Sequence, residues 1–208
     1  MVKLANLNLK SKYWSKSMDS KYCYPDSNVL INKFDVREID KFDQLERIFT
    51  SYRLGELELK PVAFSFDLKH LQTIHHRIFK DLFDWAGKLR EVDIAKENSF
   101  FAPSIQIESY SQEIFRQLKN ERYLKGLDFN DFCERAAHYL GEINALHPFR
   151  EGNGRTQREF IRNLAENNEF SLSWANVDRT EFIKASQESF LKGDNHRFKK
   201  IIEQSIEN

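Results

Sequence analysis

The chain has 208 residues, a length at which one domain with one hydrophobic core is the default expectation. Its 32 lysines and arginines balance its 32 aspartates and glutamates, so no overall positive charge favours nucleic-acid binding or attraction to an anionic membrane. Cys23 and Cys133 form no Cys-x-x-Cys pair and the sequence has no signal-like or membrane-spanning apolar run, so we expect a cytoplasmic protein without direct membrane or nucleic-acid contact.

Residues 1–34 are polar, aromatic and turn-forming without a helical period, and are predicted to form an extended N-terminal lead-in. Residues 35–208 are predicted to form a single helical domain, because apolar residues recur at intervals of three and four. A capping box at Asp35 and Glu38 is expected to begin the first helix, which ends near Gly55. The apolar residues expected along it are Ile39, Phe42, Leu45, Phe49 and Tyr52.

The other helices are placed by their caps or first residues together with apolar spacing. Their expected starts lie at or near Asp67, Ser104, Asp128, Asn153, Asp178 and Asp194. The longest apolar stripe runs from Phe129 to Ile143 and predicts a central helix. That helix must end near Leu146, because the residue before Pro148 is disfavoured in the helical region.

Strand signals are concentrated in residues 88–102. Residues 89–96 alternate in side-chain character, and residues 97–99 supply turn chemistry before two phenylalanines, which predicts a small β-hairpin. An irregular loop is the alternative for this stretch. A single hairpin on a helical body is typical of a lid or a docking edge.

The densest polar chemistry follows the central helix, in HPFREGNGR at residues 147–155. Pro148 places His147 at the end of that helix and not on its side. The two glycines and Asn153 permit left-handed backbone and close approach of a ligand. A helix beginning at about Asn153 would point its unpaired amides and the positive end of its dipole into the turn. The loop is therefore predicted to bind phosphate.

Charged side chains around this loop fit a polyphosphate. Arg155 and Arg158 are three residues apart on one helix face, and each guanidinium can take a pair of phosphate oxygens. Glu151 beside these cations is best explained by Mg²⁺, which prefers carboxylate and phosphate oxygens. His147 suits a general base, because an imidazole ordinarily has a pKa near neutrality. The alternative without a binding or catalytic function is a charged, glycine-rich connector between helices.

Residues 147–158, HPFREGNGRTQR, match without departure the signature of the Fic family: His-Pro-Phe, any residue, Asp or Glu, Gly-Asn-Gly-Arg, two residues and Arg. Looser similarity covers KYCYPDSNVLINKF near the start, DWAGKLR at 84–90 and IAKENSFFAPS at 94–104. The chain thus resembles this family over most of its length. The resemblance implies a mainly α fold, a Fic-type helical bundle with a small β-hairpin flap over the active site.

The resemblance also implies an activity: transfer of AMP from ATP to a hydroxyl side chain of a target protein. His147 would be the catalytic base and Glu151 would hold Mg²⁺. The nucleotide-binding residues carried over are Gly152, Asn153, Gly154, Arg155 and Arg158. The flap residues expected to dock the target are Ile94, Lys96 and Phe101, and Ser189 and Phe190 would border the adenine pocket.

Fic proteins are commonly inhibited by a helix with Ser or Thr, three residues, Glu, then Gly or Asn. This sequence lacks that pattern; the nearest stretch begins at Ser104 and has Ser109 in the last position. The chain therefore resembles the toxin branch that is inhibited by a separate antitoxin protein. Some members of that branch modify ATPase subunits of bacterial type II topoisomerases, which are candidate targets here.

Two alternatives stay open beside adenylyl transfer: a non-catalytic, nucleotide-dependent protein-binding module, and a transferase that uses another nucleotide or phospho-donor. A metal site on the second helix is disfavoured, because His70, His75 and His76 lack the i, i+4 pair of a zinc-binding helix. They are expected to be ordinary surface or core-edge histidines.

Overall fold

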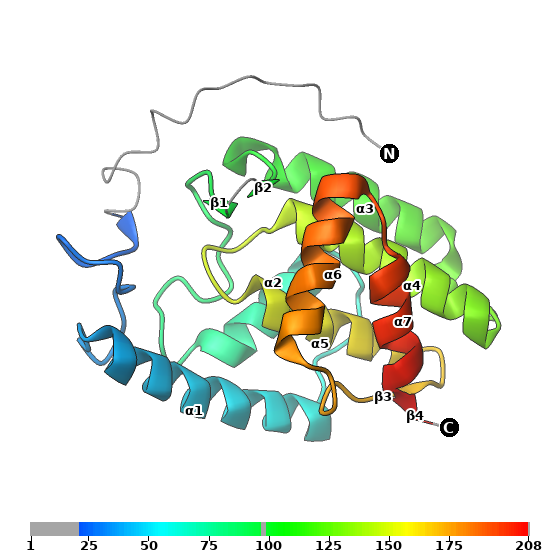
Figure 1. Cartoon of the computed structure of the whole chain (residues 1–208), viewed down its shortest axis with the longest axis horizontal. Coiled ribbons are helices and arrows are strands. Elements are labelled where there is room, and N and C mark those ends of the chain that lie inside the picture. Colours follow the sequence, from blue (N-terminus) through cyan, green and yellow to red (C-terminus); the bar gives the residue numbers. More distant parts are fainter. Residues whose placement is uncertain (1–20, 97–98, 208) are drawn as a thin grey trace.

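The structure is a computed structural model that describes residues 21–96 and 99–207. Helices dominate these residues, which confirms the mainly α prediction (Figure 1). The α-helices are α1 (Ile39–Leu59), α2 (Leu68–Phe79), α3 (Ile107–Asn120), α4 (Phe129–Leu146), α5 (Asn153–Glu166), α6 (Arg179–Lys192) and α7 (His196–Ser205). Two 3-10 helices, η2 (Ser104–Gln106) and η3 (Arg122–Leu124), flank α3. None of the described helices is long and apolar enough to cross a bilayer.

Helix α4 lies at the centre of the bundle, where it contacts α3, α5, α6 and α7; in Figure 1, α6 and α7 (orange and red) lie in front of it. The predicted stripe on α4 is buried at Phe132, Ala136, Leu140 and Ile143, whereas Phe129 in the first turn is 40% exposed. Burial of each large apolar side chain contributes about 1.5–3 kcal/mol. This packing holds the end of α4, where the polar motif begins.

Three aspartates at predicted helix starts cap those helices. The carboxylates of Asp67, Asp128 and Asp178 accept hydrogen bonds from backbone amides in the first turns of α2, α4 and α6, respectively. A cap of this kind satisfies donors that have no partner inside the helix. The prediction succeeds at these sites because both partners lie within three residues.

The capping box predicted at Asp35 and Glu38 is wrong. Glu38 is the N-cap of α1 and makes no side-chain cap bond, while Asp35 has a positive φ of 50° and pairs with Arg37. The helix also continues past Gly55 to Leu59, because a glycine inside a helix costs only about 1 kcal/mol. The buried side chain of Leu57 lies beyond that glycine and packs in the core.

Two apolar residues of α1 also depart from the expected stripe. Ile39 is 51% exposed and Tyr52 is 62% exposed, whereas Phe42 is buried in the core. Helical spacing places residues on one face but does not determine how much of that face a neighbour covers.

The β-hairpin is confirmed but is shorter than the sequence indicates. Strand β1 (Ala95–Lys96) pairs with β2 (Ser99–Phe100) in antiparallel register, and residues 97–98 of the predicted turn lie outside the described residues. Residues 89–94 form no strand, although their side chains alternate. The second small sheet pairs β3 (Ser171–Leu172) with β4 (Ile206–Glu207).

The described part of the lead-in, residues 21–34, packs on the helical body. Tyr22, Val29 and Leu30 are buried in the common core, and the backbone amide of Lys33 donates to the carbonyl of Leu82. Both cysteines are buried. The boundary between 1–34 and 35–208 stays a prediction, and residues 1–20 lie outside the described residues.

His70, buried between α2 and α5, is expected to make stability depend on pH. Burial lowers the pKa of His70 to about 4, below the ordinary value near 6.5 that the unfolded chain would show. Since the unfolded state takes up the proton first, the stabilisation is present above about pH 6.5 and is lost as pH falls towards 4, by up to about 1.4 kcal/mol per pH unit. Urea unfolding from pH 7.5 to 4.5 should therefore show a shallower decline in His70→Gln. The exposed His196, changed to Gln, is the control and should leave the slope unchanged.

Candidate active site

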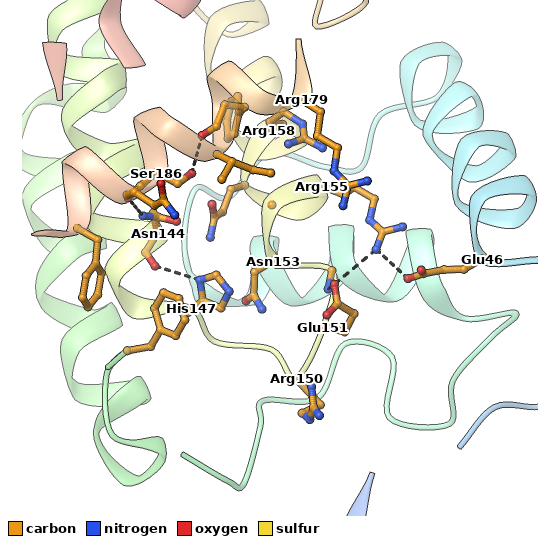
Figure 2. Close-up of a pocket in the computed structure, with 18 of the residues that line it drawn as sticks. Glu46, Asn144, His147, Arg150, Glu151, Asn153, Arg155, Arg158, Arg179 and Ser186 are labelled. Carbon is orange, nitrogen blue, oxygen red and sulfur yellow. Dashed lines mark hydrogen bonds and ion pairs between the residues drawn. The ribbon is translucent and has the colours of Figure 1, made fainter. Parts of the chain in front are cut away.

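A pocket of about 570 Å³ opens beside the loop between α4 and α5 (Figure 2). It is lined by the whole predicted set from the motif: His147, Glu151, Gly152, Asn153, Gly154, Arg155 and Arg158. Helix α1 adds Asp43, Glu46 and Arg47, and α6 adds Arg179, Phe182 and Ser186. Residues distant in the sequence therefore complete a site whose centre the motif supplies.

His147 is the C-cap of α4 and adopts left-handed backbone, with φ of 45° and ψ of 61°. A non-glycine residue in this region carries strain and is common at functional sites. Its Nδ1 lies 3.1 Å from the carbonyl oxygen of Asn144. Because a carbonyl can only accept, Nδ1 carries the proton and Nε2 keeps the lone pair that a general base needs.

The ring plane of His147 is held by the flap. Phe101, directly after β2, stacks on the imidazole with 3.7 Å between ring centroids and 17° between planes. Phe190 of α6 packs edge-on against Phe101, with 5.3 Å between the two ring centroids. Of the other predicted flap residues, Ile94 packs half-buried against the core, and the side chain of Lys96 lies outside the described part.

The loop after His147 is shaped by Gly152 and Asn153. Gly152 has a φ of 80° and precedes the first turn of α5, and its missing Cβ would lie 2.2 Å from the Phe79 ring. The Asn153 side chain accepts from the amide of Phe149 at 2.9 Å and donates to its carbonyl at 2.7 Å. In this structure Asn153 therefore holds the loop closed, and the α5 amides remain as the donors for an anion.

Two arginines of α5 reach the pocket in different ways. Arg155 pairs with Glu46 of α1 at 2.7 Å and lies 3.7 Å from Glu151, so its guanidinium stands between two carboxylates (Figure 2). Arg158 lies over the Phe182 ring at 4.8 Å, and no carboxylate within residues 21–96 or 99–207 pairs with it. Burial, with repulsion from other arginines, lowers the pKa of Arg158 to about 10. An under-compensated guanidinium in a pocket is suited to phosphate.

Glu151 fits a hard cation. Its side chain is 49% exposed, and one oxygen accepts from the amide of Gly152 at 2.9 Å. Among the described residues, no cluster of three or more His, Cys, Asp or Glu could hold a metal ion. Mg²⁺ is commonly bound through one or two carboxylates together with substrate phosphates, so one carboxylate beside a phosphate loop is compatible with it.

The sequence model of the Fic/DOC family matches residues 65–165. The protein adenylyltransferase VbhT of Bartonella schoenbuchensis is 46% identical over 169 residues, which cover 81% of this chain and 35% of VbhT. The probable protein adenylyltransferase Fic of Escherichia coli strain K12 is 39% identical over 80% of this chain and 82% of its own length. The chain belongs to the Fic/DOC family. The chain thus spans about a third of the first relative and most of the second.

The Fic fold is also found by comparison with solved structures. The N-terminal Fic domain of a putative cell filamentation protein from Bartonella quintana, with bound ADP, aligns with a TM-score of 0.85 and 26% identity. The alignment covers 91% of this chain and 96% of that chain. The expected Fic-type helical bundle with a small hairpin is therefore confirmed.

Two residues that support this Fic site were not expected from the sequence. His75 is fully buried: its Nδ1 accepts from the amide of Gly87 at 2.8 Å, and its Nε2 lies 3.0 Å from the carbonyl of Glu151. It therefore holds the loop that carries the Glu151 carboxylate, which a helix with irregular histidine spacing does not reveal. Glu46 was also missed, because it lies 109 residues from Arg155 in the sequence. The predicted adenine-pocket residue Ser189 instead bonds Asn195, whereas Phe190 does line the pocket.

Glu46→Gln is expected to tighten ADP binding by roughly five- to tenfold, or about 1–1.4 kcal/mol. The carboxylate competes with phosphate for Arg155, and burial raises its pKa, so its charged form is costly in this pocket. Isothermal titration calorimetry at pH 7.5 measures the change. Asp40→Asn is the control, since it removes the same charge from an exposed position of the same helix. Equal or weaker ADP binding by Glu46→Gln would show that Glu46 orients Arg155 instead of competing for it.

Proposed function

We propose that this chain is a protein adenylyltransferase that moves AMP from ATP to a hydroxyl of a target protein. Its support is one observation: the imidazole of His147 faces the same pocket as the α5 amides and two arginines. Curated relatives that carry this name are 37–46% identical over most of the chain. Nε2 of His147 takes the proton of the target hydroxyl. The hydroxyl oxygen then bonds to the α-phosphorus, and the bond from that phosphorus to the β-bridging oxygen breaks, so pyrophosphate leaves.

The other residues bind and orient the nucleotide. The amide of Gly154 and the other amides in the first turn of α5 cradle the α-phosphate, while Arg155 and Arg158 take the β- and γ-phosphates. Arg179, at the start of α6, adds a third guanidinium to the rim. Glu151 would hold Mg²⁺, which supplies charge neutralisation for the phosphates. Ile94, Lys96 and Phe101 form the flap against which the target docks.

Labelled ATP separates this function from its alternatives. The chain is incubated with ATP labelled at either the α- or the γ-phosphate and with proteins of a bacterial lysate. Adenylyl transfer puts only the α-label on protein, whereas phosphoryl transfer puts only the γ-label there. A binding module leaves both labels in solution. Competition by unlabelled GTP, CTP and UTP then tests the identity of the donor.

We propose further that the chain acts in the cytoplasm as the toxin of a toxin–antitoxin pair, with a small protein as inhibitor. The support is the missing inhibitory pattern in the sequence and an Arg158 without a carboxylate partner in the described structure. ATPase subunits of type II topoisomerases are the first target candidates. Induced expression should arrest bacterial growth. In a separate assay, the chain should transfer the α-label to a purified topoisomerase ATPase subunit. Normal growth in cells that contain the fully active enzyme would contradict the toxin role but not the adenylyltransferase activity.

A further inference from the structure

Arg90 has a fully buried guanidinium, and its hydrogen-bond acceptors among the described residues are all main-chain carbonyls. Nε donates to the carbonyl of His147 at 2.8 Å, and one terminal nitrogen donates to that of Val92 at 2.8 Å. The other terminal nitrogen donates to the carbonyls of Ala102 and, at 3.4 Å, Leu146. The one carboxylate paired with it in the described part of the chain, that of Asp93, is 3.9 Å away and 42% exposed, and it accepts from the amide of Ser104.

These four carbonyls belong to two parts of the site. Leu146 and His147 end helix α4, where carbonyls lack partners inside the helix and attract positive charge. Val92 and Ala102 lie on the two sides of the flap base, before β1 and after β2. Two backbone bonds join the same parts: the amide of Arg90 donates to Pro148, and the amide of Ala102 donates to Ala145. One planar side chain therefore sits between the flap and the catalytic junction.

The chemistry of the guanidinium explains why arginine is needed. Its five donors lie in one rigid plane, so it can bind carbonyls on both sides at once. A lysine ammonium is a point charge on a flexible chain and cannot span both sets. The contact at His147 is made to a residue with strained, left-handed backbone, whose conformation must be held by its surroundings.

We infer that Arg90 is a positioning residue that couples the flap to His147: displacement of the flap base on target docking is passed through the guanidinium to the catalytic histidine. The inference rests on the proposed function in taking His147 as the base. Stacking of Phe101 on the imidazole acts in the same direction, because the flap then touches both the backbone and the ring of His147. Arg90 itself lines no part of the pocket.

The test compares Arg90→Lys and Arg90→Gln with the wild-type chain and with Arg162→Lys. Arg162 is the matched control: it is a mostly buried arginine of α5 that also donates to a main-chain carbonyl, that of Leu57, but it lies outside the active-site pocket. Hydrogen exchange followed by mass spectrometry is measured with and without ADP. Both Arg90 variants should exchange faster, by about tenfold or more, in segments 99–104 and 144–149 together, with Lys intermediate. Arg162→Lys should leave both segments unchanged.

Transfer of the α-label supplies the second measurement. A 1 Å misplacement of reacting groups can cost on the order of 100-fold in rate, so Arg90→Gln should lower kcat by about that factor and Arg90→Lys by about tenfold. The KM for ATP should stay within about twofold, which separates positioning from a general loss of folding. If exchange becomes faster in only one of the two segments, or in neither, the inferred coupling is wrong. A kcat equal to that of the wild type in Arg90→Lys would also contradict it. If the wild-type chain transfers no label, the proposed function fails, and the exchange data still decide the coupling.

Discussion

His147→Ala is expected to lower the rate of AMP transfer by about 10²–10⁴-fold, the usual contribution of a positioned general base. Three features place the imidazole for this role: His147 is the C-cap of α4, its Nδ1 bonds the carbonyl of Asn144, and its ring stacks on Phe101. Alanine removes the proton acceptor but leaves the amides of α5 and the arginines in place. Because the phosphate contacts are the same in wild type and variant, ADP affinity should stay within about twofold of wild type.

The measurement is the initial rate of α-label transfer, with ADP binding followed in parallel by calorimetry. His196→Ala serves as the control, since that histidine is exposed on α7 and lies away from the pocket. Equal transfer by wild type and His147→Ala would remove His147 as the base. Loss of ADP binding in His147→Ala would mean that the histidine stabilises the loop between α4 and α5 and does not act as the proton acceptor.

Gly152→Ala is expected to cost about 2–5 kcal/mol of unfolding free energy and to weaken ADP binding more than tenfold. Alanine at a φ of 80° carries a conformational cost of about 1–2 kcal/mol. A Cβ there would also lie 2.2 Å from two carbons of the Phe79 ring, and overpacking adds about 1–3 kcal/mol. The loop must move to relieve this contact, which displaces the amides at the start of α5. Urea unfolding and calorimetry measure the two effects.

Gly126 provides a matched control for this substitution. Its φ is 82°, nearly that of Gly152, but an added Cβ would meet nothing within 4 Å. Gly126→Ala should therefore show only the conformational cost, with unchanged ADP binding. Equal destabilisation by the two substitutions would mean that Phe79 yields and that the close approach of ring and loop does not shape the phosphate site.

The sequence by itself determined which residue types gather at the candidate site and the local structure that presents them. Pro148 lies two residues after Leu146, the last residue of α4, and α5 begins at Asn153 as expected. The caps at Asp67, Asp128 and Asp178 were also predictable. Each of these features depends on partners a few residues apart, where steric limits and hydrogen-bonding groups are written directly in the sequence.

Only the tertiary structure decided which distant groups complete and support the site. Glu46 reaches Arg155 because α1 packs beside the pocket, and His75 reaches the Glu151 carbonyl because α2 packs on α5. Arg90 was expected in an alternating strand, yet it is buried beneath the end of α4, where it donates to the carbonyl of His147. Such contacts arise when helices bury their apolar faces against one another. Apolar spacing predicts which face of a helix is buried, but it does not predict which polar side chains of other helices will lie beside it.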